Sequence, residues 1–207
     1  DLLQEYRLSV TDMNTYLRCP VTFYYEKVLK IPSAKTESLA LGSAAHEALE
    51  NFIKKSKEEK RMLEKDEFLH LYKIALDKQK SILTPTKYES DLEYGNKFLG
   101  AYYDLKLVEY NLPQTTQEIN VRARINDDVL LKGMLDRIEE QQNNVLVYDY
   151  KTGKHKSESF KKPNDEKTKD EHILKYGGDY WRQSVFYAVL LEHSEKHFNL
   201  NVNLVTF

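Results

Sequence analysis

Two aspartates and a lysine stand in two short phrases that could carry chemistry. The phrases read Gly-Met-Leu-Asp-Arg-Ile (133–138) and Tyr-Asp-Tyr-Lys-Thr-Gly (148–153), and they contain Asp136, Asp149 and Lys151. The polar run Gln-Gln-Asn-Asn (141–144) between them predicts a hairpin turn. If the turn is centred between residues 142 and 143, Ile138 faces Val147 and Asp136 faces Asp149.

That pairing predicts a site for a divalent cation. Facing residues of an antiparallel pair point to one side of the sheet, and side chains two apart on a strand share a side. Asp136, Asp149 and Lys151 therefore converge, while Tyr150 turns away and leaves its backbone carbonyl near the same edge. Two facing carboxylates repel unless a shared proton, a lysine or a cation compensates. Oxygen ligands favour Mg²⁺, Mn²⁺ or Ca²⁺, which can polarise a phosphate and activate water, so the pattern indicates phosphodiester hydrolysis.

Ordinary structural explanations exist for the same residues. Asp136 could form a surface ion pair with Arg137, and a register shift of one residue would turn Asp136 to the other face. His46, among apolar residues at helical spacing, could be a core histidine bonded to a carbonyl. Gln183 and Tyr187, one helical turn apart, could simply close a helix onto the sheet.

The hydrophobic periodicity predicts the elements that would position these residues. Helices are expected from Ser9 to Leu17 and over 37–57, 66–83, 89–110 and 179–194. Strands are expected near 116–125, 129–139, 145–151 and 200–207. The Lys-rich stretch from 154 to 175 predicts a solvated loop, which could also guide a phosphate backbone. The fold class expected is a mixed α/β (α+β) single domain over 1–207, with a helical part to about 115 and a sheet core from about 116.

Composition limits the class of protein. The 207 residues carry 31 Lys and Arg against 33 Asp and Glu, a net charge of -2, so any grip on nucleic acid must be local or come from a partner domain. The single cysteine, Cys19, excludes disulfides and four-cysteine clusters within the chain and suits a reducing, cytoplasmic compartment. No signal peptide or apolar run of membrane-spanning length is present. Because the chain starts at Asp1 and ends in a strand-like run, we expect it to be a piece of a longer protein.

The phrases around the two aspartates resemble the core of the PD-(D/E)XK nucleases. The resemblance is to the RecB/AddB-like branch, in which they read G-x-x-D-R and D-Y-K-T-G. Three more phrases agree in order: Leu-Gly-Ser-Ala-Ala-His (41–46), Gln-Ser-Val-Phe-Tyr (183–187) and Tyr-Leu-Arg-Cys-Pro (16–20) with Phe23. They resemble the branch's metal-binding histidine segment, its Q-x-x-x-Y motif and its N-terminal C-P-x-x-F/Y segment. The match runs from about residue 8 to 191 and implies a restriction-endonuclease-like sheet flanked by helices.

The resemblance implies a role for each matching residue. The metal, Mg²⁺ or Mn²⁺, would be held by the carboxylates of Asp136 and Asp149, a nitrogen of His46 and the backbone carbonyl of Tyr150. Lys151 would orient or activate the attacking water and stabilise the charge of the transition state.

Further positions are implied around this centre. Gln183 and Tyr187 would line the site and help to place the substrate strand, and Glu118 would match a further acidic position of the branch. Several members carry an iron–sulfur cluster on four cysteines, the first in the segment around Cys19. The other three are missing here, so no cluster is expected. Cys19 is then predicted to be a small buried residue, with the segment pinned by Phe23, Tyr24 and Tyr25.

The function implied is that of a deoxyribonuclease, specifically an exonuclease. It would be the nuclease module of a helicase–nuclease that processes DNA ends in repair or recombination, with single- or double-stranded DNA ends as substrate and a helicase domain in the same or a partner chain. The sequence itself contains no P-loop. Two alternatives remain open at this point: a catalytically silent DNA-binding or scaffold module on the same fold, and an RNA-directed or structure-specific endonuclease.

Overall fold

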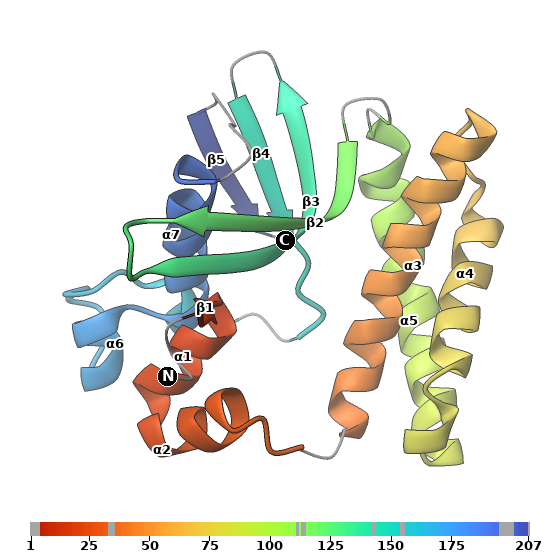
Figure 1. Ribbon diagram of the computed structural model, residues 1–207. Coiled ribbons are helices and arrows are strands. Elements are labelled where there is room, and N and C mark those ends of the chain that lie inside the picture. Colours follow the sequence, from red (N-terminus) through yellow and green to blue (C-terminus); the bar gives the residue numbers. More distant parts are fainter. Residues whose placement is uncertain are drawn as a thin grey trace.

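The computed structural model describes residues 5–32, 36–110, 112, 115–141, 144–153, 156–194 and 201–206. A five-stranded mixed sheet lies between helices, with a three-helix layer on one side (Figure 1). This mixed α/β arrangement is consistent with a restriction-endonuclease-like fold and confirms the predicted fold class. None of the helices in the described part of the chain is long and apolar enough to cross a membrane.

The long strand β3 organises the sheet. The strands are β1 (Arg7–Leu8), β2 (Thr115–Arg124), β3 (Leu130–Gln141), β4 (Asn144–Asp149) and β5 (Asn201–Thr206). One edge of β3 pairs with β2 in antiparallel fashion, and the other edge pairs first with β1, parallel, and then with β4, antiparallel. Strand β5 then adds to β4 in parallel. The sequence did not predict β1, whose two residues join the sheet from within the helical N-terminal part.

The hairpin of β3 and β4 has the predicted register. Ile138 pairs with Val147, and Arg137 pairs with Tyr148. The residues expected at the tip of the turn, 142 and 143, lie outside the described residues. Because side chains alternate along a strand, this register sets which residues meet at the open end of the hairpin.

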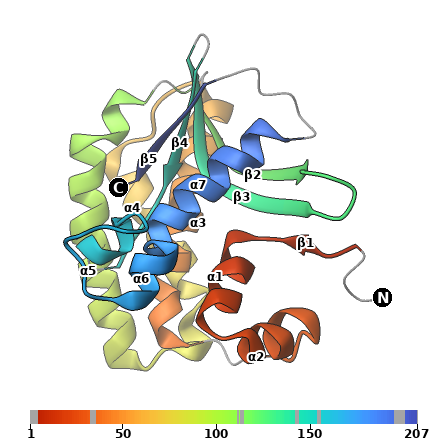
Figure 2. The same cartoon turned by 90° about the vertical axis from the view of Figure 1, so that its left-hand side faces the viewer.

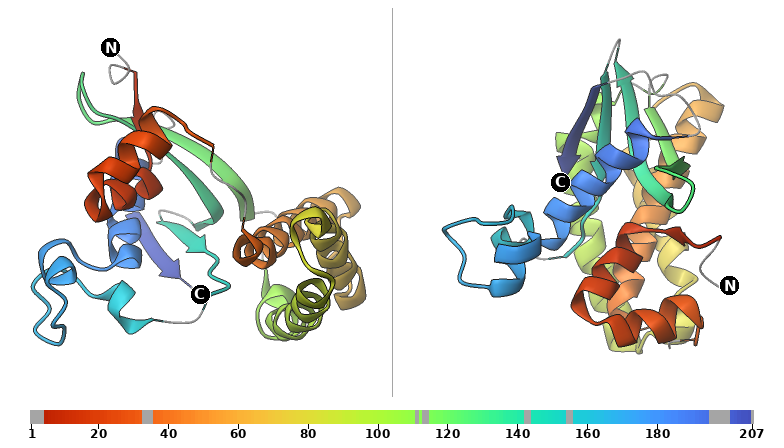
Figure 3. Two further views of the ribbon diagram at one scale, coloured as in Figure 1. Left: turned by 90° about the horizontal axis from the view of Figure 1, so that it is seen from below. Right: turned by 60° about the vertical axis from the view of Figure 1, so that its left-hand side comes forward.

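The N-terminal helices begin at recognisable capping residues. Helix α1 (Val10–Arg18) starts after Ser9, which forms a capping box with Asp12. Helix α2 (Pro20–Phe23) starts at Pro20, because proline fits the first position of a helix. It continues into a π-helix, η1 (Tyr24–Val28). The view from below shows α1 and α2 on one side of the β2–β3 ribbon and the three-helix layer on the other (Figure 3).

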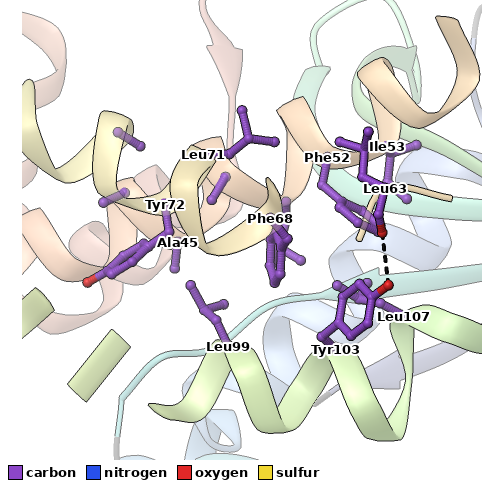
Figure 4. Packing of buried hydrophobic residues seen from close by; sticks show 14 of the residues in the cluster. Ala45, Phe52, Ile53, Leu63, Phe68, Leu71, Tyr72, Leu99, Tyr103 and Leu107 are labelled. Atoms are coloured by element: carbon purple, nitrogen blue, oxygen red, sulfur yellow. Dashed lines mark hydrogen bonds between the residues drawn. The ribbon is translucent and has the colours of Figure 1, made fainter. Parts of the chain in front are cut away.

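Helices α3 (Glu37–Glu59), α4 (Lys65–Asp77) and α5 (Pro85–Leu105) form that layer, with short 3₁₀ turns η2 (Lys80–Ile82) and η3 (Leu107–Glu109). Their interior is one hydrophobic cluster, in which Phe52, Phe68 and Tyr103 pack ring against ring. The Tyr103 hydroxyl donates a 2.9 Å hydrogen bond to the carbonyl of Leu63 (Figure 4). Helix α5 begins earlier than predicted, because Pro85 occupies its first turn behind the Thr84 cap.

A second hydrophobic cluster joins the sheet to α7 (Asp179–Glu192), which crosses it beside β3, β4 and β5 (Figure 2). The segment before α7 corrects the prediction of a solvated loop over 154–175. It contains the 3₁₀ turn η5 (Ser157–Phe160) and helix α6 (Glu171–Tyr176). Lys161 is only 14% exposed at its side chain, pairs with Glu158 and donates a 2.7 Å hydrogen bond to the carbonyl of Lys167. Residues 154 and 155 of the stretch lie outside the described part.

The segment around Cys19 also differs from expectation. Cys19 is half-buried rather than buried, and hydrogen bonding with Thr22 lowers the pKa of its thiol. Phe23 packs edge-on against the rings of Tyr6 and Tyr16, as a pinning residue would. The other two aromatic residues, Tyr24 and Tyr25, contact each other and are about half exposed, 51% and 50%, so they do not pin the segment to the core.

Candidate active site

The open end of the β3–β4 hairpin brings the two aspartates together. Asp136 and Asp149 lie one step beyond the Arg137–Tyr148 pair. The backbone N–H of Tyr150 donates a 2.7 Å hydrogen bond to Oδ2 of Asp136. Arg137 does not pair with Asp136, which corrects the surface ion-pair alternative. It forms an ion pair with Glu139 instead, with its guanidinium between two tyrosine rings.

His46 reaches this end of the hairpin from α3. Its Nε2 lies 3.1 Å from the carbonyl oxygen of Tyr150, and its Nδ1 lies 3.4 Å from Oδ1 of Asp136. The imidazole side chain is 31% exposed, so it lines an open site rather than a closed core. Burial disfavours the charged imidazolium, but the carboxylates of Asp136 and Asp149 outweigh this effect and raise the pKa of His46.

Close contact between α3 and the strand end depends on a glycine. A Cβ atom at Gly42 would lie 3.2 Å from Oγ1 of Thr152, tighter than ordinary van der Waals contact. Gly42 and His46 are one helical turn apart. The glycine thus lets the helix approach residues 150–152 closely enough for the imidazole to reach Tyr150 and Asp136.

Asp149 is more buried than Asp136 or His46: 7% of its side chain is exposed, against 13% and 31%. Burial raises the pKa of Asp149, and the nearby charge of Asp136 adds to this effect, while the Lys151 ammonium opposes it. Lys151 forms an ion pair with Oδ2 of Asp149. That oxygen is buried and accepts no hydrogen bond of regular geometry from the described residues, so nearby positive charge compensates it, chiefly the Lys151 ammonium and to a smaller extent His46.

Two residues of α7 hold the other oxygen of Asp149. Gln183 donates a 2.9 Å hydrogen bond from Nε2 to Oδ1 of Asp149, and a second one of 2.8 Å to the hydroxyl of Tyr187. The Tyr187 hydroxyl lies 3.4 Å both from that same Oδ1 and from the carbonyl oxygen of Met134. Helix α7 thereby orients the carboxylate through the oxygen that Lys151 does not contact.

A cavity of ≈ 820 Å³ opens between α3 and β3 beside these groups. Its walls include His46, Asp136, Met134 and Thr152. Met134 is 50% exposed, so an apolar side chain lies beside the acidic group at the mouth of the cavity.

The same residues lie within a match to a known protein family. The model of the PD-(D/E)XK nuclease superfamily matches residues 7–205, nearly the whole chain. The chain belongs to the PD-(D/E)XK nuclease superfamily. No curated protein matches it significantly.

The donor set fits the divalent cation that nucleases of this superfamily generally use. Two carboxylates, one carbonyl and one imidazole are available, and the buried Oδ2 of Asp149 lacks a regular hydrogen bond. The ligands do not yet converge on one position, however. Within the described ranges, no group of three His, Cys, Asp or Glu side chains is placed to hold one metal ion. His46 contacts the Tyr150 carbonyl with Nε2 and Asp136 with Nδ1. A single cation bound to one ring nitrogen can therefore reach both oxygen ligands only if the imidazole or a carboxylate rotates.

The site residues expected from the sequence of this PD-(D/E)XK protein therefore lie within one region. Its seven members are His46, Asp136, Asp149, Tyr150, Lys151, Gln183 and Tyr187. The side chain of Glu118 lies outside the described part. Sequence reasoning missed Thr152 and Met134, although each stands one or two positions from an expected residue. The alternation of exposed side chains on β3 could have indicated Met134.

Proposed function

We propose that this member of the PD-(D/E)XK superfamily is an active metal-dependent deoxyribonuclease. The observation that carries the proposal is the contact of Lys151 with Asp149 at the same hairpin end where Asp136 meets Tyr150 and His46. Burying the carboxylate of Asp149 costs free energy, and a catalytic role for the two acids and the lysine would explain why it is buried. The stability of the sheet does not explain it, since the facing carboxylates repel.

In this proposal Mg²⁺ or Mn²⁺ would be held by Asp136, Asp149, the carbonyl of Tyr150 and one nitrogen of His46. When bound there, the cation would polarise a phosphate oxygen and lower the pKa of a coordinated water. The protein supplies the orientation. The amide of Tyr150 fixes Asp136, and Gln183 fixes Asp149. Hydrogen bonds from neighbouring residues to metal ligands commonly determine how well those ligands are oriented.

Lys151 has two proposed tasks. In the protein without substrate its ammonium neutralises Asp149. If a bound cation supplied that neutralisation, the ammonium of Lys151 would be able to contact a phosphate oxygen and the attacking water. A positive charge held there stabilises the negative charge that grows on the phosphate oxygens during in-line attack. Its side chain is 26% exposed, so it can reach a substrate without leaving the site.

The resemblance of the five phrases supports finer assignments. We place the chain in the RecB/AddB-like branch, as the exonuclease module of a helicase–nuclease that acts on DNA ends in the cytoplasm. The helicase domain would lie in the same or a partner chain. These finer assignments rest on the order of the five phrases in the sequence. The superfamily match does not distinguish between branches.

Cleavage of end-labelled single- and double-stranded DNA in Mn²⁺ tests the proposed activity. Asp149→Asn and Lys151→Ala should each lower the rate by about 10²–10³-fold, as expected for loss of transition-state charge stabilisation. Lys97→Ala, on the exposed face of α5, is the matched control and should cleave at the wild-type rate. Equal cleavage by all four proteins would refute the assignment and indicate a contaminating nuclease.

A catalytically silent DNA-binding module is the second candidate. The absence of a converged three-ligand cluster among the described residues favours it. Calorimetric titration with Mn²⁺ separates the two candidates. Stoichiometric binding that Asp136→Asn abolishes supports the nuclease, whereas no heat of binding together with retained DNA affinity supports the silent module.

A further inference from the structure

A second cleft, of ≈ 580 Å³, is lined by basic residues and includes Lys132 of β3, the strand that carries Asp136. It is formed by β1, the π-helix η1 and the β2–β3 ribbon. Five basic residues line it: Arg7, Lys27, Lys30, Arg122 and Lys132. Because the whole chain has a net charge of -2, this concentration of positive charge is a local feature and not a consequence of composition.

The acidic residues of the cleft compensate this charge only in part. Three of them line it, against the five basic residues. Asp12 is buried and accepts the hydrogen bond from the Ser9 N–H in the cap of α1. Glu5 and Glu26 are exposed at the rim. Within the described ranges, four of the cations make no ion pair with a carboxylate: Lys27, Lys30, Arg122 and Lys132.

The pairing of β2 with β3 places two of these cations face to face. Arg122 and Lys132 are direct partners in the antiparallel ladder, and both are exposed. Like charges opposite each other destabilise a sheet, so this pair does not contribute to the fold. An anion bound between them would remove the repulsion.

Strand β3 runs from the cleft to the proposed active site. Lys132, Met134 and Asp136 are alternate residues of the strand and so share a side. The opposite side faces α7, since a Cβ at Gly133 would lie 2.6 Å from Leu190. Met134 and Asp136 line the active-site cavity, and Lys132 lines the basic cleft. At ~3.3 Å per strand residue, Lys132 and Asp136 are about 13 Å apart along β3, roughly four nucleotides at a rise of ~3.4 Å.

The opposite wall of the cleft has an unusual backbone. Lys27 belongs to the five-residue π-helix, and Lys30 follows with a φ of 55°. π-Helical turns are rare and occur often at functional sites, whereas a left-handed residue commonly ends a helix. This wall therefore carries one cation on a rare π-helical turn and a second at the end of the same helix.

We infer that the basic cleft binds the phosphodiester backbone of the DNA strand whose scissile phosphate lies at Asp136 and Asp149. The location of the scissile phosphate rests on the proposed function; the anion site itself does not. Cations from β1, from the η1 segment and from the β2–β3 ribbon line one cleft, so several successive phosphates can each meet a positive charge. The cleft thereby supplies the local grip that the near-neutral composition lacks, and it holds the strand a few nucleotides from the point of cleavage.

Fluorescence anisotropy with a labelled single-stranded oligonucleotide in EDTA tests the cleft without any cleavage. The charge-reversal variant Arg122→Glu/Lys132→Glu should bind about tenfold more weakly or worse. Its plot of log affinity against log salt should be shallower by about 1.4, because each phosphate contact to a single strand contributes ~0.7 to the slope. The control Lys60→Glu/Lys97→Glu makes the same change of charge at exposed positions of the three-helix layer and should lose much less. Equal losses in the two variants would overturn the inference.

Two further arms distinguish the possible outcomes. Inorganic phosphate should displace the oligonucleotide no better than chloride at equal ionic strength; specific displacement would show a site for an isolated phosphate and would overturn the backbone assignment. If the wild type never cleaves DNA but only the cleft variant loses affinity, the proposed nuclease activity is wrong and DNA binding by the cleft is supported. If the wild type cleaves and the cleft variant has an unchanged KM, DNA binding by the cleft is wrong and the nuclease activity is supported.

Discussion

The backbone N–H of Tyr150 donates a 2.7 Å hydrogen bond to Oδ2 of Asp136, across the open end of the β3–β4 hairpin. The carbonyl of the same residue lies 3.1 Å from Nε2 of His46. The backbone of one residue thus links the strand that carries the first acid to the helix that carries the histidine. Its side chain is buried in the three-helix cluster, so packing of the Tyr150 ring fixes the position of both backbone groups.

Asp136→Asn should remove cation binding while it preserves the hairpin. The amide oxygen can still accept the hydrogen bond from Tyr150, but the residue loses the negative charge that attracts a cation. Because partners of metal ligands already change affinity by about 10–100-fold, loss of a ligand charge should lower Mn²⁺ affinity by about 100-fold or more. Calorimetry measures the affinity. Asp127→Asn, in the exposed β2–β3 turn, is the control and should bind as the wild type does.

Gln183→Ala should slow cleavage without weakening substrate binding. The amide of Gln183 orients Asp149 through a 2.9 Å hydrogen bond, so its loss should lower kcat by about 10–100-fold with little change in KM. Tyr187→Phe should have a smaller effect, because its hydroxyl is 3.4 Å from the carboxylate, near the limit for a hydrogen bond. Val185→Ala, exposed on the same helix, controls for helix stability. A rise in KM alone would show that Gln183 contacts substrate rather than Asp149.

The register of the hairpin could be predicted from sequence, because a polar turn between two alternating segments leaves few possible pairings. The parallel partners of the sheet could not. β1 joins β3, and β4 joins β5, over long separations that leave no local signal. The same holds for the contact of His46 with Tyr150, which are 104 residues apart. Only the resemblance to a nuclease family led us to expect these two residues in one site.

The Lys-rich stretch shows why composition misled the prediction of a loop. Its charged residues indicate contact with solvent, but several of them also bond within the stretch. Asp170 caps α6 by accepting hydrogen bonds from the N–H groups of His172 and Ile173. The carboxylate of Glu158 accepts a hydrogen bond of 2.6 Å from the hydroxyl of Thr168. Such local bonds can order a segment that buries few apolar side chains.

Glu67→Gln should destabilise the protein at neutral pH and not in acid. Glu67 accepts hydrogen bonds of 2.8 and 2.7 Å from Arg61 and one of 2.7 Å from the N–H of Glu64, where α4 begins. The hydrogen bonds from Arg61 are the largest cause that lowers the pKa of Glu67 from 4.5 to about 2. A lowered folded-state pKa stabilises the fold above the unfolded value, and this stabilisation is lost as the pH falls from 4.5 towards 2.

Thermal melts followed by circular dichroism check this pH dependence. The Tm of Glu67→Gln should lie below that of the wild type at neutral pH, and the gap should close through the acid range. Glu58→Gln removes an exposed carboxylate near the end of α3 and should show no such gap. A difference that stays constant with pH would mean that the variant disturbs packing rather than the charged hydrogen bonds.

Two glycines of α5 should respond to alanine with opposite sign. A Cβ at Gly95 would lie 2.1 Å from the ring of Tyr72, which is fully buried and donates a 2.7 Å hydrogen bond to the carbonyl of Asp91. The ring cannot move away without breaking that bond, so Gly95→Ala should lower the free energy of unfolding by about 1–3 kcal/mol. At Gly100 the nearest atom is 3.1 Å away, at the flexible end of Lys65.

Gly100→Ala should therefore stabilise the protein, because Lys65 can shift and alanine favours a helix over glycine by up to about 1 kcal/mol. Urea unfolding curves measure the free energy of unfolding of both variants. In thermal melts, each kcal/mol should move the Tm by about 2–4 °C in a chain of this size. Neither glycine lines the active-site cavity, so both variants should bind Mn²⁺ as the wild type does. A stabilising Gly95→Ala would mean that the ring of Tyr72 has room to move, and that α4 and α5 are packed less tightly than the contact at Gly95 requires.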